Sequence, residues 1–111
     1  MTLTCVSTVT DSEFDRRVWQ SPTPVLVDFY SDHCEPCRAI KPVLEALCQE
    51  RDDVQVMTVS VPENLDISLA MKIRAVPTLI LFKEGEVAGK VTGLKSKTDL
   101  NQWIDEALQA S

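Results

Sequence analysis

Residues 25–37 carry the strongest structural signal in the chain, reading Val25-Leu26-Val27-Asp28-Phe29-Tyr30, then Ser31-Asp32-His33, then Cys34-Glu35-Pro36-Cys37. The first six form a nearly continuous apolar run bounded by turn residues, which is typical of a strand buried on both faces. From Cys34 to about Gln49 apolar residues recur at helical spacing, and Pro42 should kink this helix. The sequence therefore predicts a buried strand that leads into a helix, with two cysteines where the helix begins.

Further strands and helices alternate along the rest of the chain. Residues 10–13 form a capping box, which should start a helix that ends near Trp19. Another helix should begin at residues 62–64 and carry Leu65, Leu69 and Met71. The last helix should cover residues 96–108. We expect the remaining strands over residues 3–9, 54–61, 78–82 and 87–92, the last two joined by a hairpin turn at 83–86. This order predicts an α/β fold with helices on both sides of a sheet, in one domain of residues 1–111.

Composition excludes several classes of partner. The chain has 111 residues, 44% of them hydrophobic, and a net charge of −6. Because nucleic acid attracts basic surfaces, this charge argues against nucleic acid as a partner. No apolar run approaches the roughly 20 residues of a membrane span, so we expect no membrane partner. Residues 1–5 lack the basic and apolar segments of a signal peptide, and we therefore expect a cytoplasmic protein.

Cys34 and Cys37 combine the features that thiol chemistry requires. The thiolate is the nucleophile, and the exposed N–H groups and dipole of a helix N-terminus stabilise it. A spacing of three residues brings the Cβ atoms of a helical pair within about 5–6 Å, close enough for a disulfide. We therefore expect Cys34, at the exposed end of the helix, to attack a substrate, and Cys37, one turn deeper, to resolve the mixed disulfide.

The alternative use of such a pair is half of a zinc site. Structural zinc has four ligands, usually two cysteine pairs or a cysteine pair and a histidine pair. This chain has no second pair, and its one histidine, His33, adjoins Cys34. Redox chemistry is therefore the prediction, with no metal.

The other two cysteines stand alone in the sequence. Cys48 falls on the apolar side of the helix that follows Cys34, so we expect an unreactive core thiol there. Cys5 lies near the exposed start of a strand, and we expect a surface thiol without a role. Glutathionylation of Cys5, or an intermolecular bridge through it, is the alternative.

Asp28 is the one charged residue in the buried strand at residues 25–30. A buried carboxylate is costly unless it is paired or protonated, and burial raises the pKa of such a group toward neutrality. A carboxyl group of this kind is suited to relay a proton. The alternative is an edge strand from which Asp28 faces solvent. A third feature, Val76-Pro77-Thr78, places a proline directly before a buried strand, where a special turn and a cis bond are both options.

Together these motifs resemble the thioredoxin family in order and spacing, over about residues 4–108. The matching stretches are residues 25–29, the Cys34–Cys37 motif, residues 73–79 and residues 82–86. The resemblance implies a five-stranded mixed sheet flanked by four helices. It also implies that Cys34 is the nucleophile, Cys37 the resolving thiol and Asp28 the buried relay carboxylate.

The resemblance extends to a substrate surface. It implies a cis Pro77 opposite Cys34, and a Val76 backbone that hydrogen-bonds an extended substrate. Gly93 matches the family glycine that keeps a loop low beside the site. The chain departs from the family at His33 and Tyr30, where tryptophan is common, and at Glu35, where glycine is usual; we expect these three at the substrate-binding rim. Thr58 stands where a lysine normally neighbours the buried aspartate.

The predicted function is therefore reduction of protein disulfides by a monomeric thiol–disulfide oxidoreductase. Reduced Cys34 would attack a substrate disulfide, and Cys37 would release the reduced substrate. The resemblance implies that the Cys34–Cys37 disulfide is the only redox group and that no other cofactor is needed. It also implies a thioredoxin reductase as the electron donor. The alternative is a redox-inert binding module, or a subunit of a larger complex, that merely retains the thiols.

Overall fold

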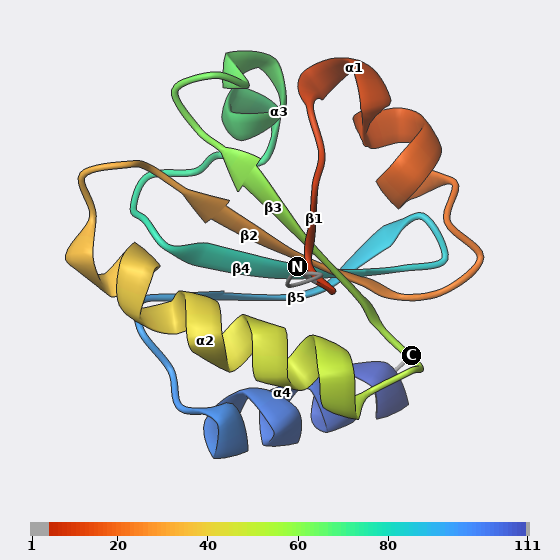
Figure 1. The fold of residues 1–111 in the computed structure, drawn as a ribbon. Helices are drawn as coiled ribbons and strands as arrows, with labels where there is room; N and C mark the ends of the chain where they lie inside the picture. The colour runs from red at the N-terminus through yellow and green to blue at the C-terminus, as the bar shows by residue number, and fades with distance from the viewer. Residues whose placement is uncertain (1–4, 111) are drawn as a thin grey trace.

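The computed structural model describes residues 5–110, which form one mixed sheet between two layers of helices (Figure 1). Residues 1–4 lie outside this range, and with them the first part of the strand expected over residues 3–9 and most of the segment that lacks the features of a signal peptide. In chain order the elements are β1 (Ser7–Thr8), α1 (Asp11–Phe14), the π-helix η1 (Asp15–Trp19), β2 (Val25–Tyr30), α2 (Glu35–Glu50), β3 (Gln55–Ser60), α3 (Leu65–Ala70), β4 (Thr78–Lys83), β5 (Glu86–Thr92) and α4 (Lys97–Gln109).

The sheet has the strand order β1-β3-β2-β4-β5. Strands β1, β3 and β2 run parallel, whereas β4 is antiparallel to β2 and β5 is antiparallel to β4. The apolar run that suggested a buried strand is thus the central strand, and all its residues from Val25 to Phe29 are buried. The prediction of a five-stranded mixed sheet is confirmed.

Each face of the sheet packs against its own set of helices. One face carries the side chains of Val25, Val27 and Phe29, which pack with residues of α1, η1 and α3. The opposite face carries Leu26, which packs with Ile40, Leu44 and Leu47 of α2 and with Leu100 and Ile104 of α4. Figure 1 shows α2 and α4 together on one side and α1 and α3 on the other. The alternation of side chains along β2 therefore decides which residues face α2.

Of the local predictions for the helices, the one at the start of α1 is confirmed. The capping box predicted at residues 10–13 is present, and in it the Glu13 carboxylate accepts a hydrogen bond from the Thr10 N–H. The Thr10 hydroxyl donates a further hydrogen bond to the same carboxylate. Beyond Phe14 the helix widens into a π-helix, which the capping pattern did not indicate. Helix α2 runs through Pro42 as one element of 16 residues.

Helix α3 turns only part of its apolar sequence toward the core. Ile67 and Met71 pack against the buried cluster beneath it. Leu65 and Leu69 face outward instead, with 58% and 76% of their surface exposed. Residues four positions apart share a face of a helix, whereas residues two apart lie on nearly opposite faces, so α3 cannot direct both sets of side chains inward.

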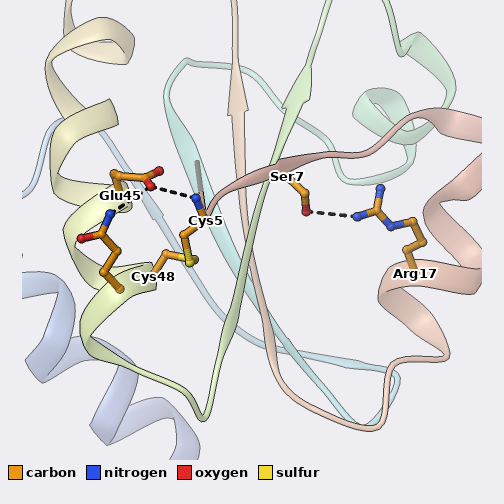
Figure 2. The surroundings of a disulfide bond; sticks show 6 residues. Cys5, Ser7, Arg17, Glu45 and Cys48 are labelled. Atoms are coloured by element: carbon orange, nitrogen blue, oxygen red, sulfur yellow. Dashed lines mark hydrogen bonds between the residues drawn. A yellow bond between two sulfur atoms is a disulfide. The ribbon is translucent and has the colours of Figure 1, made fainter. Parts of the chain in front are cut away.

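The prediction of two unpaired outer cysteines is wrong. Cys5, just before β1, forms a disulfide with Cys48 near the end of α2 (Figure 2). Their Cα atoms are 5.9 Å apart although the residues are 43 positions apart in sequence. Beside the bond, the Cys5 N–H donates a hydrogen bond to Glu45 Oε1 over 2.8 Å. The short β1 brings Cys5 alongside the last turns of α2, which no local pattern could indicate.

Candidate functional site

The two closely spaced cysteines lie where β2 ends and α2 begins. Cys34 is the N-cap residue of α2, with extended backbone angles (φ −125°, ψ 110°), and Cys37 lies in the first turn. Pro36 occupies that turn as well, where its missing N–H costs no hydrogen bond. The two sulfur atoms are joined in a disulfide, with the Cα atoms 5.2 Å apart. The expected start of this helix at or near Cys34 is confirmed.

The two cysteines differ in their access to solvent. Cys34 keeps 8% of its surface exposed and Cys37 only 1%. The Cys37 N–H donates a hydrogen bond to Cys34 Sγ over 3.1 Å. Cys34 is thus the more exposed cysteine and has a helix N–H directed at its sulfur, although it is more deeply buried than the sequence suggested.

A loop from the far end of the chain forms the other wall of the site. The Val76–Pro77 peptide bond is cis, and Cys34 Sγ lies 3.7 Å from the Val76 carbonyl oxygen. The Gly93 N–H donates a hydrogen bond to the Pro77 carbonyl over 2.8 Å. Gly93 has φ +88°, a conformation that other residues rarely adopt, so glycine suits this position. The structure therefore brings Val76 beside Cys34 and joins Gly93 to Pro77, the next residue of the same loop.

Asp28 is fully buried in the central strand, and the alternative of an exposed edge strand is wrong. Neither carboxylate oxygen has a hydrogen-bond partner among residues 5–110. Burial raises the pKa of Asp28 from 3.8 to about 7, and the positive charge of Lys41 acts in the opposite direction. Asp28 can therefore change its charge near neutral pH, which few carboxyl groups do.

The three residues expected at the rim lie close to the cysteines in sequence but differ in exposure. His33 and Glu35 are exposed on either side of Cys34. Tyr30 is half-buried at the end of β2, and the Lys41 ammonium lies over its ring, 5.4 Å from the centroid. Beside Glu35 the surface is hollowed, and the exposed Leu94 contributes to this hollow together with Arg38.

Two features of this region were missed from sequence. Lys41 acts on Asp28 from helix α2, where it looks like an ordinary surface lysine. Only an indirect sequence feature pointed to it. Thr58 stands where the family usually has a lysine beside the buried aspartate, so a cation near Asp28 has to come from another element. The Cys5–Cys48 bond was missed because the two residues are distant in sequence.

Residues 5–110 contain neither a cluster of metal-binding side chains nor a helix that could span a membrane. No three His, Cys, Asp or Glu side chains in this range gather so as to hold a metal ion. None of the helices in the same range is long and apolar enough to cross a membrane.

Comparison with known proteins gives consistent matches over nearly the whole chain. The family model described as Thioredoxin matches residues 5–106. A thioredoxin of Rickettsia bellii is 39% identical over 100 residues, covering 89% of this chain and 95% of the relative. Thioredoxin 1 of Synechococcus elongatus is 37% identical over 107 residues, covering 96% of this chain and 100% of the relative. Thioredoxin C-2 of Corynebacterium nephridii is 40% identical over 107 residues, covering 96% and 98%.

Proposed function

The chain belongs to the thioredoxin family and is a thiol–disulfide oxidoreductase, and from this premise we propose which of its residues carry out the exchange. Cys34 is the nucleophile, Cys37 the resolving thiol and Asp28 the proton acceptor. The observation that carries this assignment is the Cys34–Cys37 pair at the start of α2, with the more exposed cysteine at the N-cap.

The reaction proceeds in two exchanges. The Cys34 thiolate attacks one sulfur of a substrate disulfide, so a mixed disulfide forms and the other substrate sulfur leaves as a thiolate. Cys37 then loses its proton and attacks Cys34 Sγ, which breaks the mixed disulfide and releases the second substrate sulfur. The substrate gains two electrons and two protons, and Cys34 and Cys37 become the disulfide present in the structure.

Asp28 serves the second exchange. Cys37 is buried and must lose a proton before it can attack. A carboxyl group with a pKa of about 7 is ionised in part at neutral pH, so it can take up a proton and release it again. An ordinary exposed carboxylate would be too weak a base for this step.

The substrate lies along the wall opposite Cys34. The Val76 backbone, beside the attacking sulfur, hydrogen-bonds an extended segment of the substrate, and Pro77 and Gly93 keep this wall low. His33, Glu35 and Tyr30 contact the substrate from the rim. The exposed Leu94 adds apolar surface next to Glu35.

We further propose an oligomeric state, a compartment and an electron donor for this protein. The chain works as a single-domain monomer in the cytoplasm and receives its electrons from a thioredoxin reductase. Its redox group is its own disulfide, with no further cofactor. Trapping of thiols in intact cells tests the compartment, because a reducing cytoplasm keeps Cys34 and Cys37 reduced.

Turnover of a disulfide substrate such as insulin, with dithiothreitol as donor, tests the assignment without any reductase. The unaltered protein should accelerate reduction, and Cys34→Ser should abolish this. Cys37→Ser should accumulate the mixed disulfide, visible by mass spectrometry. The double variant Cys5→Ser/Cys48→Ser is the matched control and should keep turnover. Full activity of Cys34→Ser would overturn the assignment, and an inert unaltered protein would favour a binding module instead.

A further inference from the structure

Asp28 and Thr58 lie next to each other on the face of the sheet that is covered by α2. Side chains alternate along a strand, so Asp28 points to the same side as Leu26, which packs against α2 and α4. Thr58 pairs with Asp28 in the parallel register of β2 and β3. Val56, two positions before Thr58, packs against α2 and α4 as well. The carboxyl group therefore lies beneath α2, beside an uncharged threonine.

A pocket of about 170 Å³ opens over this part of the sheet. Thr58 forms part of its lining from the sheet, and Lys41, Leu44 and Glu45 line it from α2. Val6 completes it from the segment before β1. Lys41 thus reaches the pocket from one side while Asp28 lies next to Thr58 on the other.

The position of the Lys41 ammonium is further defined by Tyr30. The ammonium lies over the Tyr30 ring, 5.4 Å from its centroid. Tyr30 is two positions after Asp28 in β2, so its side chain points to the same face of the sheet. A cation over an aromatic ring gains electrostatic stabilisation, which holds Lys41 on this side of α2.

We propose that Lys41 is a positioning residue for the exchange reaction: from helix α2 its ammonium supplies the positive charge that makes Asp28 able to give up its proton. The inference rests on the proposed relay role of Asp28 for its functional meaning. Strand β3 brings only the uncharged Thr58 to this place. Without Lys41, burial alone would act on the carboxyl group and hold its proton more firmly.

The other titratable groups around Asp28 do not offer a second cation among residues 5–110. Helix α2 also brings Glu45 to the pocket and Cys37 to its first turn. The pKa of Tyr30 is raised chiefly by burial, and the charge of Asp28 adds to this. Strand β4 contributes Leu79 opposite Asp28 in the register, and α4 contributes buried leucine and isoleucine. Glu45, being acidic, would oppose Lys41 rather than replace it.

The decisive measurement is a titration of the Asp28 carboxyl carbon by NMR in the intact oxidised protein. Lys41→Gln should raise the Asp28 midpoint by about half a pH unit or more, as expected when one full charge is removed from partly solvated surroundings. Lys41→Arg should leave it near the unaltered value. Lys95→Gln is the matched control, since Lys95 lines a separate pocket beside Asp99 and Trp103 and its loss changes net charge equally. An equal midpoint in Lys41→Gln and the unaltered protein would overturn the proposal.

Two further readouts separate the charge of Lys41 from a packing effect. Added salt should raise the Asp28 midpoint in the unaltered protein and have a smaller effect in Lys41→Gln, because Lys41 is exposed and its charge is screened. Thr58→Lys in the Lys41→Gln background should bring the midpoint back down, because it returns a cation beside Asp28. Failure of both would show that Lys41 does not act through its charge.

The pH dependence of insulin reduction distinguishes this inference from the relay role itself. If Asp28 relays the proton, the acidic limb of the pH–rate profile should shift in Lys41→Gln by as much as the NMR midpoint. A shifted midpoint with an unchanged profile would refute the relay role and leave the electrostatic role of Lys41 standing. An unshifted midpoint would refute the role of Lys41 whatever the profile does.

Discussion

The Cys37 N–H donates a hydrogen bond to Cys34 Sγ over 3.1 Å. This bond is fixed by the first turn of α2, in which Cys34 is the N-cap and Cys37 follows three positions later. A backbone N–H at a helix N-terminus stabilises negative charge. When the disulfide is reduced, the same N–H remains directed at the outer sulfur, so the geometry favours a thiolate on Cys34 over one on Cys37.

Alkylation of the reduced protein should therefore label Cys34 before Cys37. The reason is twofold: Cys34 is more exposed, and it has the N–H donor. Cys5→Ser/Cys48→Ser should be used as the parent, so that the exposed Cys5 does not compete for the reagent. Peptide mass spectrometry after short exposure to iodoacetamide gives the order. Faster labelling of Cys37 would reverse the assigned roles.

Asp28→Asn should stabilise the protein more at pH 8 than at pH 4, where stabilisation is the free energy of unfolding of the variant minus that of the unaltered protein. The folded protein holds the Asp28 proton up to about pH 7, whereas the unfolded chain releases it near the ordinary value of 3.8. As pH rises from about 4 to about 7, the free energy of unfolding of the unaltered protein therefore falls by on the order of 4 kcal/mol because of this group. Above about pH 7 the contribution of Asp28 no longer changes.

Urea unfolding at several pH values measures the effect. The free energy of unfolding of Asp28→Asn, minus that of the unaltered protein, should grow from pH 4 to pH 7. Asp52→Asn, at an exposed position before β3, is the control and should show no such growth. A difference that stays constant with pH would mean that Asp28 is ionised in the folded protein throughout.

Loss of the Cys5–Cys48 bond should lower the free energy of unfolding by up to about 4 kcal/mol. The estimate follows from the chain entropy of a loop closed across 43 positions. Urea unfolding of Cys5→Ser/Cys48→Ser under oxidising conditions measures it. The matched variant Cys34→Ser/Cys37→Ser opens a loop across only 3 positions and should lose less. Equal losses in the two variants would contradict the entropic account.

Glu35→Gln should make the Cys34–Cys37 disulfide easier to reduce. Glu35 is exposed in the first turn of α2, directly after Cys34, and its negative charge opposes formation of a thiolate there. Removing the charge stabilises the reduced state, so the reduction potential should become less negative by on the order of 10 mV. Redox titration against glutathione gives the value, and high salt should shrink the change. An unchanged potential would show that the Glu35 charge does not reach the sulfur, and a more negative one would show that the predicted sign is wrong. Glu106→Gln on α4 supplies the comparison.

The parts of the site that sequence reasoning found share a local cause. Burial of Asp28 followed from the apolar residues on both sides of it in one strand, and the helix start at Cys34 followed from the cysteine spacing and Pro36. Such features depend on neighbours along the chain, so a short stretch of sequence contains them. The cis bond before Pro77 was reached only through the family resemblance, because a proline before a strand is usually trans.

What sequence reasoning missed depends on how α2 docks on the sheet. Docking places Lys41 near Asp28 and Cys48 near Cys5, and neither pair is close along the chain. The outward direction of Leu69 has a related origin, since α3 contacts the core on one side and Leu69 lies on the other. These relationships are set by packing between layers, which local periodicity does not record.

The covalent link between Cys5 and Cys48 also alters how the molecule would respond to mechanical force. A pull applied at the two ends of the chain passes through this bond, so the 43 positions between the cysteines cannot be stretched while it is intact. That shielded loop contains β1, α1, η1, β2 and most of α2, and with them Asp28 and the Cys34–Cys37 pair. Reduction of the outer bond would release roughly 150 Å of additional extension, at about 3.5 Å per residue. Under tension, the segment that contains Cys34 and Cys37 therefore cannot extend, whereas the part of the chain after Cys48, with β3, α3, β4, β5 and α4, can unfold and extend.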